Sequence, residues 1–392
     1  MSPRPISLSP DLRRLREEGY DIKIQAGHLV VKSVPYVTAR KEVRGGTLVA
    51  VLTLAGDVAD KPTDHVAMFE GEYPCHADGS PIEAIRHGSG RREVAPGLFI
   101  DHSFSGKSTS GPDENFYDKM TRYIRIISSQ AASLDPAATA RVYPFVEAEE
   151  EESVFAYIDT ASSSAGTAAL SRKLEMGSVA IVGLGGTGSY VLDLVAKTPV
   201  RQIHLFDGDH FLQHNAFRSP GAASCDELRA KPCKVDYLTA EYSKMHRGIV
   251  PHPYCLDQSS LEELRGMEFV FLCLDRGIAK KDIVQALLGW GALFIDVGMG
   301  VELGEDDLGG VLTLTAVTAE KSDHVERRIR FTDADPAADY SRNIQIADLN
   351  ALNAALAVIR WKKIRGFYRD QIHAHYNTYT IGSGVLTHEE QL

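Results

Sequence analysis

The stretch that decides the fold is "VAIVGLGGTGSYVLDL", residues 179–194, where four glycines stand between an apolar run and a run with helical spacing. A glycine-rich turn between a strand and a helix lets backbone N–H groups approach phosphate oxygens at the helix N-terminus. Dehydrogenases, flavoproteins and nucleotidyl-transferring enzymes can all use such a turn. The stretch therefore predicts a nucleotide site and leaves its chemistry open.

Strand-like and helix-like runs alternate from residue 178 onward. Strands are expected at "SVAIVG" (178–183), "QIHLFD" (202–207), "GIVPHPYC" (248–255), "EFVFLCLD" (268–275), "ALFIDVGM" (292–299) and "GGVLTLTAV" (309–317), with a long helix at 343–366. Runs that are apolar throughout suit a parallel sheet covered on both faces. We predict an α/β fold, with a Rossmann-like, mostly parallel sheet and helices on both faces.

The residues before this sheet differ in pattern. Short apolar alternations at 21–37, 45–55, 65–73 and 97–104 predict strands, and Phe116, Met120, Tyr123, Ile124 and Ile127 recur at helical spacing. An acidic run, "EAEEEES" at 147–153, is most simply a solvated connector. We therefore expect a smaller strand-rich α+β domain at 1–145, a linker at 146–170 and the nucleotide-binding domain at 171–392.

Composition excludes several classes of protein. The net charge of -11 argues against a broad surface for nucleic acid or for an anionic membrane. The five cysteines contain no C-x-x-C pair, so neither a disulfide framework nor a structural zinc site is indicated. We find no signal peptide and no apolar stretch of membrane-spanning length. A cytoplasmic protein that binds neither nucleic acid nor membrane is expected.

The residues after each strand carry the candidate site, because ligands of open α/β sheets bind beyond the carboxyl ends of the strands. Asp207 follows the second strand, where an acidic side chain can accept hydrogen bonds from ribose hydroxyls. With the glycine turn and Asp207 alone, a nicotinamide or flavin site ranks first. Beyond the same strand, however, come polar and cationic residues, namely Asp209, Asn215, Arg218, Lys231 and Lys234. Fixed cations suit a reaction that cleaves a nucleoside triphosphate, where charge develops on pyrophosphate.

Asp275 ends the fourth strand at the same predicted edge. A carboxylate there can bind Mg²⁺ together with substrate phosphates. Taken singly, Asp275 is better explained as the N-cap of the following helix. Taken with Asp207, Arg218 and Lys234, metal binding is the better interpretation.

This half of the chain, roughly residues 170 to 365, resembles the ThiF-like family of adenylating enzymes, which includes the ubiquitin-activating enzymes. The resemblance rests on a glycine turn, an acidic pair, an N-x-x-R segment, a lysine opening the next helix and an aspartate ending the fourth strand. The matching residues are Gly183, Gly185, Gly186, Gly188 and Ser189 in the turn, Asp207 and Asp209, Asn215 and Arg218, Lys234, and Asp275. The lysine is chosen over Lys231 because it leads directly into the helix, although "KPCK" places Cys233 where the family usually has proline.

The resemblance implies that ATP binds at the glycine turn and that the C-terminal carboxylate of a small ubiquitin-like protein attacks its α-phosphate. It further implies that Asp207 holds the ribose, that Asn215, Arg218 and Lys234 orient the phosphates, and that Asp275 ligates Mg²⁺. A bacterial conjugation or sulfur-transfer pathway, a homodimer and a ubiquitin-conjugating-like partner are expected by the same analogy. The N-terminal domain is then expected to recruit a partner.

The sequence also departs from the family pattern. No cysteine follows Cys273, so the usual thioester position is empty; Cys225, Cys255, or the hydroxyls of Thr318 and Ser322 are the alternatives. Arg122 and Arg125 could be donated to a second subunit's site, but surface arginines on a helix are the simpler interpretation. An NAD-dependent oxidoreductase and a non-catalytic docking module remain alternative functions.

Overall fold

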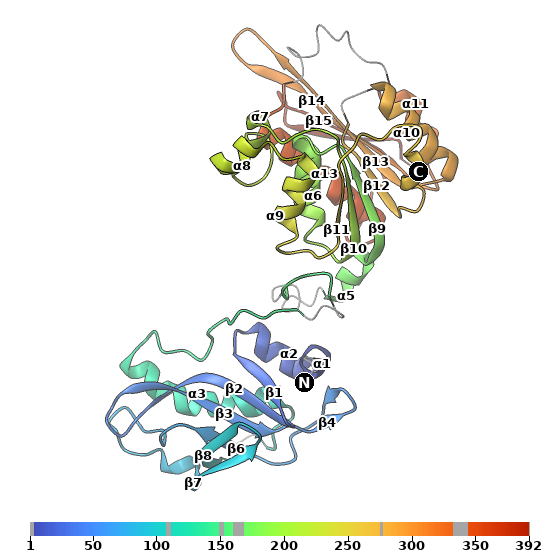
Figure 1. Cartoon of the computed structure of the whole chain (residues 1–392). Coiled ribbons are helices and arrows are strands. Elements are labelled where there is room, and N and C mark those ends of the chain that lie inside the picture. The colour runs from blue at the N-terminus through green and yellow to red at the C-terminus, as the bar shows by residue number, and fades with distance from the viewer. Residues whose placement is uncertain are drawn as a thin grey trace. The chain divides into compact units, whose positions relative to one another are not determined.

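The computed structural model describes residues 4–106, 111–148, 153–159, 168–274, 277–331 and 344–391. The chain divides into two compact units, which are described separately (Figure 1). The first unit comprises Met1–Val146 and Asp159–Thr167, and the second comprises Glu147–Ile158 and Ala168–Leu392.

The first unit is built on a six-stranded antiparallel sheet with the strand order β1-β2-β3-β6-β8-β7. Its helices are α1 (Arg4–Leu8), α2 (Pro10–Glu17), η1 (Glu83–Ile85) and α3 (Phe116–Leu134). Its strands are β1 (Ile22–Gln25), β2 (His28–Val37), β3 (Val43–Val51), β6 (Val66–Glu70), β7 (Arg86–Ala95) and β8 (Leu98–Ser105), with a separate small hairpin of β4 (Leu54–Ala55) and β5 (Val58–Ala59).

Helix α3 packs its apolar side against this sheet. The five residues predicted to recur at helical spacing, from Phe116 to Ile127, are all buried in the core of the first unit. Asn115 caps the helix, because its side chain accepts a hydrogen bond from the Asp118 N–H. The prediction of a strand-rich α+β region is confirmed, whereas α1, α2 and the polar edge strand β7 were not predicted.

The second unit contains an eight-stranded sheet with the strand order β11-β10-β9-β12-β13-β14-β15-β16. The strands are β9 (Met176–Val182), β10 (Val200–Phe206), β11 (Ile249–His252), β12 (Phe269–Leu272), β13 (Phe294–Leu303), β14 (Leu308–Val317), β15 (Tyr376–Thr380) and β16 (Val385–Glu389). The helices are α5 (Ala168–Ser171), η2 (Arg172–Leu174), α6 (Gly186–Val195), α7 (Gln213–Ala216), α8 (Cys225–Ala230), α9 (Lys234–Tyr242), η3 (Leu261–Leu264), α10 (Gly277–Trp290), α11 (Val325–Arg328) and α13 (Ala347–Ile364).

In this spatial order, the first five strands, from β11 through β10, β9 and β12 to β13, pair in parallel. The strands from β13 through β14 and β15 to β16 pair antiparallel. Apolar residues of α6, α9 and α13 cover one face of the sheet, and apolar residues of α10 cover the other. The predicted Rossmann-like sheet with helices on both faces is therefore confirmed. Within the described residues, no helix is both long enough and apolar enough to cross a membrane.

The described residues of the segment 147–158, which begins with the acidic run, pair with other residues of the second unit. The Ala156 N–H donates to the Met245 carbonyl at 2.8 Å, and the Arg247 N–H donates to the Val154 carbonyl at 2.7 Å. The Arg247 guanidinium adds a hydrogen bond to the Ala148 carbonyl at 2.7 Å. The described part of this segment is therefore held by backbone pairing, which the charge pattern alone did not indicate.

Candidate nucleotide-binding site

The site is built on the carboxyl edge of the parallel strands. Phe206 and Leu272 both pair with Val182, so the residues that follow these three strand ends leave the sheet side by side. Gly183 follows Val182 and has a φ of +88°, a conformation that favours glycine. Its N–H donates to the Phe206 carbonyl at 2.8 Å. The turn therefore begins at the topological position where open α/β sheets bind nucleotides.

Helix α6 begins at this turn with no side chain capping its first N–H groups. Gly185 is its N-cap residue and supplies no side-chain hydrogen bond. Uncapped N–H groups at a helix N-terminus, together with the helix dipole, attract an anion such as phosphate. Ser189 is fully buried, and its hydroxyl donates to the Gly186 carbonyl at 2.8 Å. The Ser189 hydroxyl is thus bonded to the backbone of its own helix.

Gly188 makes close packing of this turn possible. A Cβ atom at Gly188 would overlap the carbonyl oxygen of Gly183, whereas a Cβ at Gly185 would meet no atom within 4 Å. Gly188→Ala is expected to destabilise the second unit by about 1–3 kcal/mol or more and to disrupt the turn. Gly185→Ala is the matched control and should cost clearly less, because its Cβ meets no atom and only the poorer N-cap preference of alanine opposes it. Denaturant unfolding of the two variants checks this, and equal midpoints would contradict it.

Asp207, Asp209 and Lys234 form an ion-pair group beside the turn. The Lys234 ammonium contacts both oxygens of Asp207 at 3.3 Å and the Asp209 Oδ2 at 2.8 Å. Asp207 also accepts hydrogen bonds from the Leu184 N–H at 2.7 Å and the Asp209 N–H at 2.8 Å. Lys234 and Asp207 are buried, but the Asp209 side chain is 59% exposed. This group ties the glycine turn to α9 and presents one carboxylate to solvent.

The chain brings Lys234 to the aspartates by pairing two short segments. The Lys234 N–H donates to the Asp209 carbonyl at 2.9 Å, and the Phe211 N–H donates to the Pro232 carbonyl at 2.8 Å. Lys231, in contrast, is exposed and adopts a left-handed conformation at the end of α8, with a φ of +47°. Of the two lysines considered from sequence, the structure brings Lys234 to the aspartate pair.

Asn215 and Arg218 lie on the segment between the aspartates and Lys234. The Asn215 side chain is 2% exposed and its Oδ1 accepts a hydrogen bond from the Leu212 N–H at 2.9 Å. The Nδ2 of Asn215 and the Nε of Arg218 are buried and have no hydrogen-bond partner among the described residues. Burial and the positive charges of Arg218 and Lys234 lower the pKa of His214. These two buried donors have no acceptor within the described part of the chain, and they lie in a segment with two cationic side chains. Such an arrangement suits an anionic ligand.

Asp275, the predicted metal ligand, lies outside the residues that the structure describes. Among the described residues, no group of three or more histidine, cysteine or acidic side chains could hold a metal ion. Mg²⁺ in nucleotide sites commonly uses one or two carboxylates and the substrate phosphates, so no larger protein cage is needed. The metal role of Asp275 therefore stays a prediction.

A buried ion pair lies at the same edge and was not predicted. The Lys280 ammonium contacts the Asp296 Oδ1 at 2.8 Å, and both side chains are less than a tenth exposed. Asp296 pairs with Leu272, the last residue of β12. The sequence signal was a charged residue inside the apolar strand "FIDVGM", because a fully buried carboxylate is rare without a partner.

Thr318 lies at the other end of the sheet. It directly follows Val317, which pairs with Phe294, the first residue of β13. The glycine turn, in contrast, follows the last residues of the parallel strands. The Thr318 hydroxyl and the His375 Nε2 are 3.1 Å apart in a buried contact. Thr318 therefore lies away from the glycine turn, and its role as an acyl acceptor stays a prediction.

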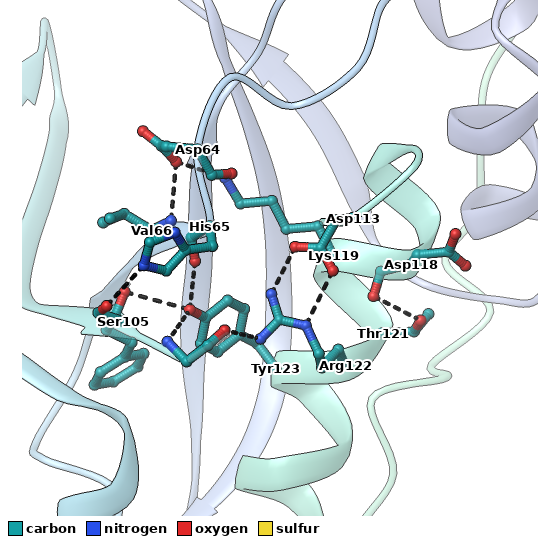
Figure 2. Close-up of polar contacts among 12 residues, drawn as sticks. Asp64, His65, Val66, Ser105, Asp113, Asp118, Lys119, Thr121, Arg122 and Tyr123 are labelled. Carbon is teal, nitrogen blue, oxygen red and sulfur yellow. Dashed lines mark hydrogen bonds and ion pairs between the residues drawn. The ribbon is translucent and has the colours of Figure 1, made fainter. Parts of the chain in front are cut away.

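Arg122, considered from sequence as an arginine for a second subunit, is used inside the first unit. Its guanidinium makes a two-point contact with Asp113, with Nε to Oδ1 at 3.1 Å and Nη2 to Oδ2 at 2.6 Å (Figure 2). On the same helix, the buried Lys119 donates to the carbonyl and the carboxylate of Asp64. These contacts hold two loops against α3, and the exposed Arg125 is the remaining candidate of that pair.

The fold and site together define a nucleotide-binding α/β unit preceded by a separate antiparallel unit. Residues 160–301 match the ThiF family, and residues 10–160 match a domain of unknown function, DUF6791. The stretch that matches the ThiF family contains the glycine turn, the Asp207 and Asp209 pair, and Lys234. No curated protein matches the chain.

Similar solved structures include PaaA and E. coli MccB. PaaA has 18% sequence identity and a TM-score of 0.45, and the match covers 57% of this chain and 66% of PaaA. E. coli MccB crystallised with ATP has 15% identity and a TM-score of 0.42, with 57% of this chain and 66% of MccB covered. The chain thus spans just under two thirds of each of these proteins.

Proposed function

We propose that the second unit catalyses ATP-dependent adenylation of the C-terminal carboxylate of a small ubiquitin-like protein. The ThiF family match supports ATP-dependent adenylation of a carboxylate in general. The observation that carries the proposal is the buried Lys234, which contacts Asp207 and Asp209 beside the uncapped first turn of α6. A redox dinucleotide needs no such buried cation near its phosphates, whereas a departing pyrophosphate does.

In the proposed reaction, a carboxylate oxygen of the partner attacks the α-phosphorus of ATP. An acyl–phosphate bond forms, the bond between the α-phosphorus and the bridging oxygen breaks, and pyrophosphate leaves with that electron pair. The carboxylate is already ionised at neutral pH, so no general base is required. The products are an acyl-adenylate and pyrophosphate.

Each site residue has an assigned role in this proposal. The uncapped N–H groups of α6 bind phosphate, and the aspartate pair Asp207 and Asp209 faces the ribose. Lys234, Asn215 and Arg218 donate to the phosphates, which would supply the acceptors that the buried Asn215 Nδ2 and Arg218 Nε lack among the described residues. Asp275 would hold Mg²⁺, which neutralises phosphate charge when it is bound.

The proposal extends to the partners of the chain. By analogy with the family, we propose a homodimer and a bacterial conjugation or sulfur-transfer pathway. The first unit would recruit the ubiquitin-like protein or a conjugating partner. Cys225 and Cys255 are both exposed and are the cysteines that could accept the acyl group.

The test is exchange of labelled pyrophosphate into ATP by the full-length protein. We expect label in ATP when Mg²⁺ and a small protein with a free C-terminal carboxylate are both present. The same partner with a C-terminal amide is the matched control and should support no exchange, because its carbonyl lacks the anionic oxygen that attacks phosphorus.

Three results would contradict the proposal. Exchange that is equally fast with the amidated partner would show that the carboxylate is not the nucleophile. NADH binding without ATP binding would favour the oxidoreductase, and binding of neither nucleotide would favour a docking module.

A further inference from the structure

Asn350 of α13 reaches the glycine turn from a distant part of the chain. The Thr187 hydroxyl in the turn donates to the Asn350 Oδ1 at 3.0 Å, although the two residues are 163 positions apart. Asn350 is fully buried. A Cβ at Gly186 would overlap the Asn350 amide, so glycine at this position leaves room for the Asn350 side chain against the turn. The Asn350 side chain is thus part of the packing that shapes the first turn of α6.

A second asparagine on the same helix makes a different contact. Asn353 is also buried, and its Nδ2 donates to the Gly298 carbonyl of β13 at 3.0 Å. The Nδ2 of Asn350 has no hydrogen-bond partner among the described residues. Residues at i and i+3 lie on one side of a helix, so α13 presents a polar stripe to the carboxyl edge of the sheet. One member of the stripe contacts the turn and the other contacts the sheet.

We infer that Asn350 is a positioning residue of the ATP site, an inference that rests on the proposed function. Phosphate at a helix N-terminus is held by backbone N–H groups, so binding depends on their orientation. Asn350 fixes that orientation through Thr187 and through its contact with Gly186. Because its amide is fully enclosed beneath the turn, Asn350 acts on ATP through the turn without touching the nucleotide.

The experiment compares Asn350→Ala with Asn353→Ala in the full-length protein. Equilibrium binding of ATP with Mg²⁺ is measured, together with thermal unfolding followed by tryptophan fluorescence. We expect Asn350→Ala to weaken ATP binding about tenfold, and Asn353→Ala to weaken it less than twofold, at similar losses of unfolding temperature. Both variants remove a buried asparagine from the same helix. If Asn350 had only a structural role, the two variants would therefore lose ATP affinity to the same extent.

Thr187→Val tests the same hydrogen bond from the other side, including the case in which Asn350→Ala fails to fold. It should weaken ATP binding by itself, and the effects of Thr187→Val and Asn350→Ala should not add in the double variant, because the two residues share one hydrogen bond. Equal weakening in the two asparagine variants, or wild-type affinity in folded Thr187→Val, would overturn the inference. A wild-type protein that binds no ATP would overturn the proposed function as well.

Discussion

Replacing Lys234 with alanine is expected to lower pyrophosphate exchange by roughly 10²–10³-fold, the usual effect of removing one fixed charge-stabilising group from an active site. Lys234 is the buried cation that contacts both Asp207 and Asp209. Without it, two carboxylates beside the phosphate turn would repel ATP. Exchange at saturating ATP and partner concentrations measures the effect, and ATP affinity is measured in parallel.

Lys231→Ala is the matched control for this experiment. Lys231 lies three positions from Lys234 and carries the same charge, but its side chain is exposed. Its loss should therefore leave exchange within about twofold of wild type. Both tryptophans of the chain, Trp290 and Trp361, lie in the second unit, so their fluorescence shows whether that unit is folded in each variant. Equal losses in Lys231→Ala and Lys234→Ala would show that the lysine contacts do not carry the chemistry.

Much of the fold could be predicted because its information is local. The strands β9 and β12 are short, largely apolar runs bounded by turns, and such runs predict buried parallel strands. The strands β15 and β16 were missed. Their sequences, "YNTYT" and "VLTHE", alternate weakly and are partly exposed at the sheet edge, so no apolar period marks them. The charged edge strand β7 escaped prediction for the same reason.

Some residues of the candidate site could likewise be predicted from the sequence, and others could not. The glycine turn, Asp207 and Lys234 each follow a strand or open a helix, so their place at the carboxyl edge follows from topology. Asn350 could not be predicted, because its partner Thr187 lies on another helix and is reached only through tertiary packing. The pair of Lys280 and Asp296 likewise joins α10 to β13. For such residues, the sequence offers only a polar side chain in an apolar element.

The ion pair of Lys280 and Asp296 gives the largest expected effect on stability. Lys280→Met leaves the buried Asp296 without its cation, which is expected to lower the free energy of unfolding by about 3–5 kcal/mol near neutral pH. The double variant Lys280→Met with Asp296→Leu should regain most of this loss, because apolar residues of similar volume often replace a buried pair without cost. Denaturant unfolding followed by tryptophan fluorescence reports the second unit.

The loss of unfolding free energy in Lys280→Met should also depend on pH, and the burial of Asp296 determines whether the loss is larger at high or at low pH. Burial raises the pKa of Asp296, against the opposing effect of Lys280. A carboxyl whose pKa is raised by folding favours the folded state at low pH, and this contribution is lost as pH rises through the folded-state pKa. Without Lys280 the pKa of Asp296 rises further, so the variant should recover stability relative to wild type as pH falls from neutral towards the ordinary range of a carboxyl pKa. A loss that is constant over this range, or that the double variant shares in full, would show that an unpaired Asp296 charge is not its cause.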